Sequence, residues 1–328
     1  MTTIRAALWA VCTACLLVAA SLSAVSAQTA WPQRSVRFIV PLGPGSGADI
    51  GARLFADRLA ARWGKPVVVE NRPGGDAIIA ITAFIGAHDD HTLLFAPAAT
   101  FTAHPYLHDK LPYDPADLAP IARVSNTIVA LTAPASLKVG TLGELIERVR
   151  AQPGKMNWAT ATGISDFLLE SFLKNAGLDM SRVPYRDPVH PATDAAEGRI
   201  QLYWGAFAIV RPYLESGKLK LLAVSNSVHI PDQPAIPTVR EAGFPTLNYD
   251  GLVGLLGPRD MASDLRKRIA ADIEAVAGDP EIKSRLLTTG QLLSPGGPDE
   301  FAASIDAQRA AVATIAKEMG IKPAQQDH

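Results

Sequence analysis

Short apolar runs alternate with helical patterns along most of the chain. Each run has the length of a buried strand, and helical segments of roughly 10–15 residues separate many of them. This alternation is typical of βα units, so it predicts an α/β fold with mostly parallel sheets. The expected strands are Val36–Pro41, Val67–Glu70, Leu93–Ala96, Pro120–Val124, Ile128–Thr132, Met156–Ala159, Arg182–Tyr185, Ile200–Trp204, Leu219–Ser225 and Leu252–Gly257.

Several helix boundaries are marked by local residue patterns. Thr141 with Glu144, and Thr238 with Glu241, have the spacing of a capping box. In a capping box a hydroxyl and a carboxylate satisfy free amides at the start of a helix, so each pair predicts a helix start. Glycines that tolerate a left-handed conformation follow four helical stretches, at positions 177, 198, 217 and 243.

The first 27 residues differ from the rest of the chain. Arg5 precedes an apolar run, Ala6–Ala20, and the segment ends in the small residues Val25–Ala27. This layout predicts a secretory signal peptide over 1–27, cleaved before Gln28, and therefore a periplasmic protein. A membrane anchor is the alternative, but the run is shorter than the ~20 residues that a span needs.

Composition narrows the function classes. Cleavage after residue 27 would remove both cysteines, so thiolate chemistry and disulfides are not expected, and no later stretch is apolar enough to span a membrane. The chain has 31 Lys+Arg and 32 Asp+Glu, and this lack of a basic excess predicts no nucleic-acid partner. Its 328 residues suggest two domains. No linker separates them, so the chain is expected to cross between them more than once.

A glycine-rich turn, Pro41–Ile50, joins the first expected strand to the first helix. Free amides and the helix dipole converge at such a junction, so it predicts an anion site that needs no cationic side chain. The alternative is a tight turn that needs glycine only for steric reasons. A dinucleotide site is disfavoured because Ala48 replaces the third glycine of the fingerprint. A hydrolase elbow is disfavoured because the glycines lie directly beside Ser46.

Metal and cofactor sites are not predicted. His88 and His91 belong to an expected surface loop. Pro105 lies between His104 and His108 and argues against a regular helical pair. Neither pair has an evident third ligand, which a metal site requires.

A second polar turn runs from Thr160 to Asp166, between an expected strand and a helix. Ser165 is a suitable residue to cap that helix, and capping is the alternative to ligand binding there. Two strand-to-helix turns, one in each half of the chain, can face each other across a cleft that holds a small ligand.

Seven segments, taken in their order along the chain, resemble the corresponding segments of one known protein family. They are WPQRSVRFIVPLGPGSGADI (31–50), GKPVVVENRPGG (64–75), LPYDPADLAPIARV (111–124), PGKMNWATATG (153–163), VPYRDPVHPATDAAEGRIQLYW (183–204), GKLKLLAVSNS (217–227) and IPTVREAGFP (236–245). Together they are similar to the extracytoplasmic solute-binding receptors of the tripartite tricarboxylate transporter family, the Bug receptors.

This resemblance implies a type II periplasmic binding-protein fold, in which two α/β domains close around a small carboxylate. Domain I is expected over 32–125 plus 250–328, and domain II over 126–249. In the family, backbone amides and hydroxyls of two facing loops hold the ligand, and a third loop adds a hydroxyl. The corresponding residues here are Gly45, Ser46, Gly47, Ala48, Asp49, Thr100, Thr160, Ala161, Thr162, Gly163, Ile164, Ser165 and Asp166.

Three positions depart from the family pattern. Ala48 and Ala98 stand where threonine and serine are common, and Phe167 stands where histidine is frequent. If these side chains line the cleft, they predict fewer donors and a preference for a monocarboxylate or aromatic carboxylate over citrate. An uncompensated Asp49 carboxylate would repel a multiply charged anion. The alternative is that the three side chains do not touch the ligand.

The resulting hypothesis is a non-enzymatic receptor for which no cofactor is predicted. It would be a monomeric periplasmic protein that delivers a small carboxylate to membrane transporter subunits. A module that presents its ligand to a sensor kinase would use the same cleft. An exported hydrolase would need a nucleophile, a base and an orienting group, and the sequence shows no such set.

Overall fold

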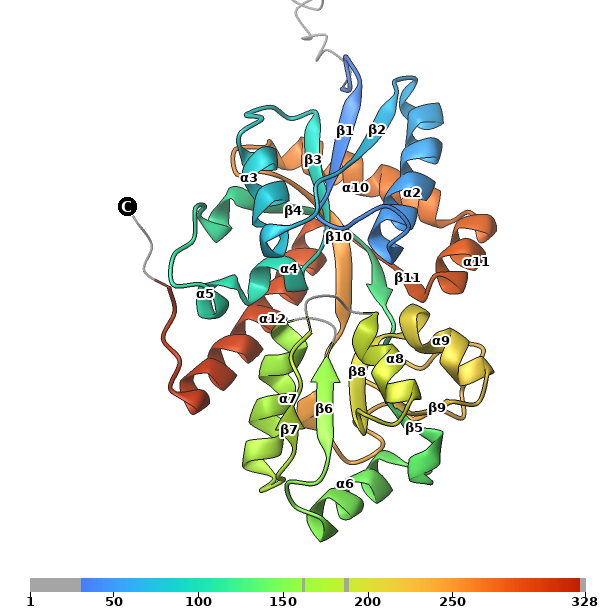
Figure 1. Ribbon diagram of the computed structural model, residues 1–328. Coiled ribbons are helices and arrows are strands. Elements are labelled where there is room, and N and C mark those ends of the chain that lie inside the picture. The colour runs from blue at the N-terminus through green and yellow to red at the C-terminus, as the bar shows by residue number, and fades with distance from the viewer. Residues whose placement is uncertain (1–30, 161–162, 186–188, 325–328) are drawn as a thin grey trace, which may run out of the picture.

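The computed structural model describes residues 31–160, 163–185 and 189–324, so the expected signal peptide lies outside the described residues. The strands form two sheets with helices packed on them (Figure 1). The six-stranded sheet has the order β11 (Gln291–Gly296), β4 (Leu118–Thr127), β10 (Gly251–Pro258), β3 (Thr92–Pro97), β1 (Val36–Val40) and β2 (Val67–Asn71). The five-stranded sheet has the order β7 (Ser181–Arg182), β6 (Asn157–Thr160), β8 (Leu202–Ala206), β5 (Val129–Pro134) and β9 (Leu219–Val224).

We refer to each sheet with its helices as the six-stranded lobe and the five-stranded lobe. Helices of the six-stranded lobe are α2 (Gly47–Trp63), η1 (Gly75–Ala77), α3 (Ile78–Ile85), α4 (Ala99–Thr102), α5 (His104–Leu107), η2 (Pro115–Asp117), α10 (Ser263–Ala277), α11 (Pro280–Thr288) and α12 (Pro298–Met319). Those between β5 and β10 are η3 (Ala135–Leu137), α6 (Leu142–Ala151), α7 (Gly163–Asn175), α8 (His190–Ala196), α9 (Phe207–Glu215) and η4 (Pro245–Leu247). None of the helices in these described ranges is long and apolar enough to cross a membrane.

The α/β class is confirmed, but the expectation of mostly parallel sheets is wrong. Strand β1 is parallel to β2 and β3, and β6 is parallel to β7 and β8. Strand β10 is antiparallel to both β3 and β4, and β5 is antiparallel to both β8 and β9. A strand buried on both faces is apolar in either direction, so the hydrophobic pattern does not encode strand polarity.

Two local features also differ from what the sequence analysis predicted. Strand β11 was not expected, because Pro295 and Gly296 interrupt its apolar pattern. The capping box at Thr238 forms, since Glu241 N donates to Thr238 Oγ1 at 3.3 Å, but it supports a single turn and no helix follows. Gly243 takes a left-handed φ of 90° and ends that turn. At the start of α6, Thr141 is the N-cap and its hydroxyl accepts from Glu144 N, but the Glu144 carboxylate accepts from Gly140 N instead of Thr141 N.

The chain changes sheet between β4 and β5 and returns before β10. The last helix, α12, contacts both lobes. Phe301 and Ile305 pack in a hydrophobic cluster of the six-stranded lobe, whereas Val312 and Ala316 pack in the main cluster of the five-stranded lobe. Figure 1 shows α12 running from behind the upper sheet to a position beside α7. The domain boundaries at 125/126 and 249/250 stay a prediction, because packing assigns this helix to both lobes.

The centre of the six-stranded sheet requires glycine at position 254. A Cβ there would lie 2.4 Å from the ring of Phe301 and 2.5 Å from the carbonyl oxygen of Ala122. We expect Gly254→Ala to destabilise the protein by about 1–3 kcal/mol, because the fully buried Phe301 ring must be displaced. Urea unfolding measures the change. Gly143→Ala is the matched control: it lies in a helix, where a Cβ would meet only Thr141 Oγ1 at an ordinary contact distance of 3.9 Å, and it should be neutral or slightly stabilising.

Candidate functional site

The turn after β1 leads directly into α2, the first long helix. Gly45 has a left-handed φ of 83°, which glycine adopts without strain. Ser46 is the N-cap of α2, and its hydroxyl accepts a hydrogen bond from Asp49 N at 3.3 Å. The local sequence therefore ends the strand, reverses the chain and starts the helix within six residues, 41–46.

Asp49 is buried beneath this turn, with only 2% of its surface exposed. Its carboxylate accepts hydrogen bonds from Gly45 N at 2.9 Å, Arg53 Nε at 3.0 Å and Asn71 Nδ2 at 2.8 Å. Burial raises the pKa of the Asp49 carboxyl, but these hydrogen bonds outweigh burial and hold the pKa below its usual range. Arg53 compensates the charge of Asp49, so the condition under which Asp49 would repel a multiply charged anion is not met.

The first turn of α2 presents backbone amides. Asp49 N and Ile50 N donate to Ser46, whereas Gly47 N and Ala48 N make no recorded hydrogen bond with any of the described residues. Unsatisfied amides at the start of a helix of 17 residues form a site with partial positive charge. The arrangement is suited to bind a carboxylate oxygen.

Gln291 packs against this helix start from β11. A Cβ on Gly47 would lie 2.4 Å from Gln291 Nε2, so the glycine allows the close approach. The Gln291 side chain is 3% exposed, donates to Thr127 Oγ1 at 3.0 Å and accepts from Ser125 Oγ at 3.1 Å. Sequence reasoning missed Gln291, because it lies over 240 residues from Gly47 in the chain and belongs to the unexpected strand.

Thr100 lies in α4, just after β3, the strand that pairs with β1. Its hydroxyl donates to Pro97 O at 2.7 Å, and the residue is half-buried. Because β1 and β3 are parallel neighbours, their carboxyl ends lie at the same edge of the sheet. Figure 1 shows the turn after β1 and the start of α4 at this lower edge, with the β6 arrow directed toward it from the other lobe.

The facing turn follows β6 and is partly described. Thr160 Oγ1 donates to Asp166 Oδ1 at 2.6 Å, and Arg182 forms an ion pair with the same carboxylate. Ala161 and Thr162 lie outside the described residues. Helix α7 begins at Gly163, three residues earlier than a Ser165 cap would place it, so the alternative in which Ser165 caps this helix is wrong.

Several predicted residues of this turn face the protein interior. Ile164 is 2% exposed and belongs to the main core cluster of the five-stranded lobe, and Ser165 is 3% exposed. The Asp166 carboxylate is already hydrogen-bonded to Thr160 and paired with Arg182. The side chains of Ile164 and Asp166 therefore support the turn.

The three departures from the family pattern are also buried. Ala98 has no exposed surface, Ala48 is 3% exposed and Phe167 is 5% exposed. All three belong to hydrophobic clusters. Their burial favours the alternative reading, that they do not touch a ligand, and removes the basis for expecting an aromatic carboxylate.

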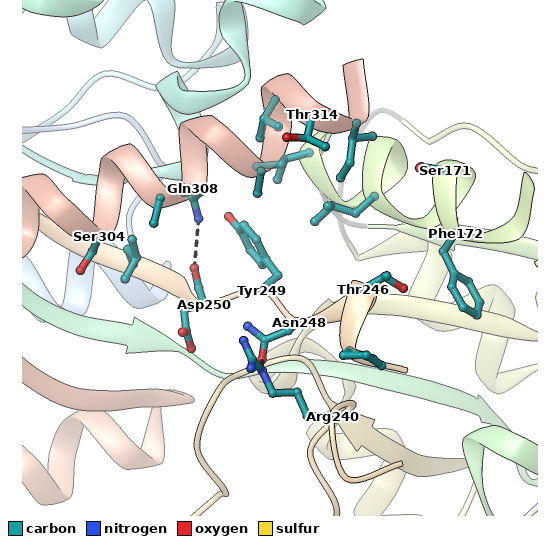
Figure 2. Close-up of a pocket in the computed structure, with 18 of the residues that line it drawn as sticks. Ser171, Phe172, Arg240, Thr246, Asn248, Tyr249, Asp250, Ser304, Gln308 and Thr314 are labelled. Atoms are coloured by element: carbon teal, nitrogen blue, oxygen red, sulfur yellow. Dashed lines mark hydrogen bonds between the residues drawn. The ribbon is translucent and has the colours of Figure 1, made fainter. Parts of the chain in front are cut away.

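A separate cavity of about 880 Å³ lies between α7, α12 and the segment leading into β10. Figure 2 shows Gln308 Nε2 donating to Asp250 O, at 3.2 Å, with the Tyr249 ring directed toward Gln308. Burial raises the pKa of Tyr249. Of the predicted site residues, Ile164 lines this cavity and those of the α2 turn do not. Sequence analysis did not identify it, because its walls come from segments that lie far apart in the chain.

Comparison with known sequences identifies relatives over nearly the whole chain. A UPF0065 protein of Bordetella bronchiseptica is 29% identical over 310 residues, covering 94% of this chain and 92% of the relative. The protein BugT of Bordetella pertussis is 31% identical over 240 residues, covering 72% of this chain and 73% of BugT.

Solved structures with the same fold include a periplasmic transporter at 30% identity, with a TM-score of 0.77 over 89% of this chain and 99% of that one. A Rhodopseudomonas palustris protein with adipate is 26% identical, with a TM-score of 0.77 over 89% of this chain and 99% of its own. MatC of the same species, with bound malate, is 26% identical, with a TM-score of 0.72 over 87% of this chain and 99% of MatC.

These neighbours confirm the two-domain periplasmic binding-protein fold. The profile of the tripartite tricarboxylate transporter family receptor, TctC, matches residues 51–320. The chain therefore belongs to the tripartite tricarboxylate transporter family of receptors.

Proposed function

We propose that this protein is a periplasmic receptor that captures a small organic carboxylate between its lobes and delivers it to a tripartite tricarboxylate-type transporter. The observation that carries the proposal is the start of α2, where the amides of Gly47 and Ala48 have no recorded partner among the described residues. A bound carboxylate would complete these two hydrogen bonds and interact favourably with the helix dipole.

The proposed site combines three segments. Gly45, Ser46 and Asp49 shape the turn, and Gly47 and Ala48 supply the amides. Thr100 lies at the adjacent strand end. Its hydroxyl proton is donated to Pro97 O at 2.7 Å, so Thr100 would donate to a carboxylate only by giving up that hydrogen bond. The backbone of the facing turn completes the site: Thr160, Ala161, Thr162, Gly163, Ile164, Ser165 and Asp166.

The structural neighbours guide the choice of ligand. Two of them were solved with the dicarboxylates adipate and malate. In this chain the charge of Asp49 is neutralised by Arg53, so nothing in the α2 turn disfavours a second carboxylate. A short dicarboxylate is therefore our first expectation. The family and fold are those of receptors, which favours binding over the alternative of an exported hydrolase.

Binding by the folded protein should raise its thermal midpoint. We expect adipate or malate to stabilise the protein by about 2.7 kcal/mol when the ligand is present at 100 times its Kd. Differential scanning fluorimetry with a series of mono-, di- and tricarboxylates, followed by calorimetry of the best, measures this. Sodium chloride at equal ionic strength is the control. The proposal fails if no carboxylate in the series binds.

A pair of substitutions at one position isolates the contribution of the Gly47 amide. Gly47→Pro removes the donor, whereas Gly47→Ala keeps it; both add a Cβ against Gln291. Because a charge-assisted hydrogen bond contributes about 1.5–3 kcal/mol, we expect the proline variant to bind about 10- to 100-fold more weakly than the alanine variant. Calorimetry with the best carboxylate measures the ratio. Equal affinities would exclude this amide from the site.

The Asp49 network should make stability depend on pH. The lowered pKa of Asp49 means that its contribution is present above the usual value of 3.8 and is lost as the pH falls below it. We expect Asp49→Asn to lose about 1–3 kcal/mol at pH 7, with a smaller loss near pH 3, as measured by urea unfolding. Asp57→Asn, on the same helix, is the control. A loss that is equal at both pH values would contradict the ionised network.

A further inference from the structure

Three potential metal ligands converge in the six-stranded lobe, on segments that follow β2 and β3. Asp76 lies in η1, His104 is the first residue of α5, and His108 follows that helix. One ligand atom from each lies within 4.8 Å of the other two. Asp76 Oδ2 is 3.1 Å from His108 Nε2 and 3.5 Å from His104 Nε2.

The two histidines form the helical pair that the sequence analysis did not expect. His108 N donates to His104 O at 3.1 Å, which closes one helical turn between them. Pro105 occupies the first turn of α5, where no intrahelical partner for its nitrogen is needed, so it does not break the turn. The imidazole centroids are 5.0 Å apart. The expectation that Pro105 argues against a helical pair of His104 and His108 is therefore wrong.

The burial and hydrogen bonding of His104 suit it to act as a metal ligand. It is 1% exposed, and its Nδ1 is 2.6 Å from the hydroxyl oxygen of Tyr113. Its Nε2 is buried and has no hydrogen-bond partner among the described residues, although it is directed at Asp76. A buried polar nitrogen without a partner is costly. When Nδ1 donates to Tyr113, the lone pair of Nε2 is free for a metal, the arrangement typical of metal-bound histidines.

The spacing of the ligand atoms fits a small divalent ion. Metal–ligand bonds of about 2.0–2.1 Å with tetrahedral angles place neighbouring ligand atoms about 3.3 Å apart. The two measured distances from Asp76 Oδ2 lie on either side of that value. The side chain of Asp76 is 54% exposed and that of His108 is 28% exposed, so an ion can reach the site from solvent.

We propose that Asp76, His104 and His108 bind a divalent metal ion of the zinc class, with a fourth position open to water. Two imidazoles and one carboxylate suit Zn²⁺, and the same set excludes the oxygen-rich coordination that Ca²⁺ and Mg²⁺ require. The ion joins the segment after β2 to the segment after β3. Helix α4, which carries Thr100, directly precedes α5, so the metal also fixes one edge of the proposed carboxylate site.

The test uses the full chain without a histidine tag, after dialysis against EDTA. It carries Cys12→Ser and Cys15→Ser so that no thiolate competes for the ion. Calorimetry with ZnCl₂ should show one site, and CoCl₂ should give the visible absorption bands of four-coordinate Co²⁺. We expect His108→Gln and Asp76→Asn each to weaken zinc binding about tenfold or more.

His229→Gln is the matched control. His229 is paired with Glu241 elsewhere in the chain, so its replacement should leave zinc affinity unchanged. Far-UV circular dichroism verifies that each variant is folded, and the buried His104 is left intact for this reason. The proposal is overturned if zinc does not bind, or if His108→Gln and Asp76→Asn bind zinc as tightly as the parent chain.

Discussion

The proposed carboxylate site depends on one buried charge, the carboxylate of Asp49. An ionised group removed from water costs several kcal/mol unless donors surround it. Here the donors come from the turn, the helix and the next strand: Gly45, Arg53 and Asn71. Asn71 also donates to Leu42 O at 2.9 Å. The conformation that orients the amides of α2 is therefore fixed by satisfying this carboxylate.

A second polar contact joins the same helix to the crossing between the lobes. Gln291 packs against Gly47 and hydrogen-bonds to Ser125 and Thr127, immediately before the chain leaves the six-stranded sheet. A ligand at the start of α2 thus lies one side chain away from the segment about which the lobes would rotate. If the lobes close on a ligand as proposed, we expect closure to be coupled to the position of the Gln291 side-chain amide. Displacing Gln291 would leave buried polar atoms without hydrogen-bond partners.

The sequence predicted the strands and the family, because burial and turn residues are local properties. It did not predict strand direction, β11, or which predicted site residues face inward. Ile164 and Ser165 are examples, since packing within the five-stranded lobe decides their orientation. Asp76 was not considered with His104, because the two lie on different βα units and only the pairing of the sheet brings them together.

The packing of α12 has a consequence for the order in which the chain folds. A ribosome produces the residues of β5 to β9 before those of α12, yet Val312 and Ala316 belong to the core of that earlier lobe. The six-stranded sheet is likewise incomplete until β10 and β11 have been synthesised. Neither lobe can bury its full core until the last helix has been made. The chain therefore has to stay incompletely folded during synthesis, and both lobes reach their final packing together.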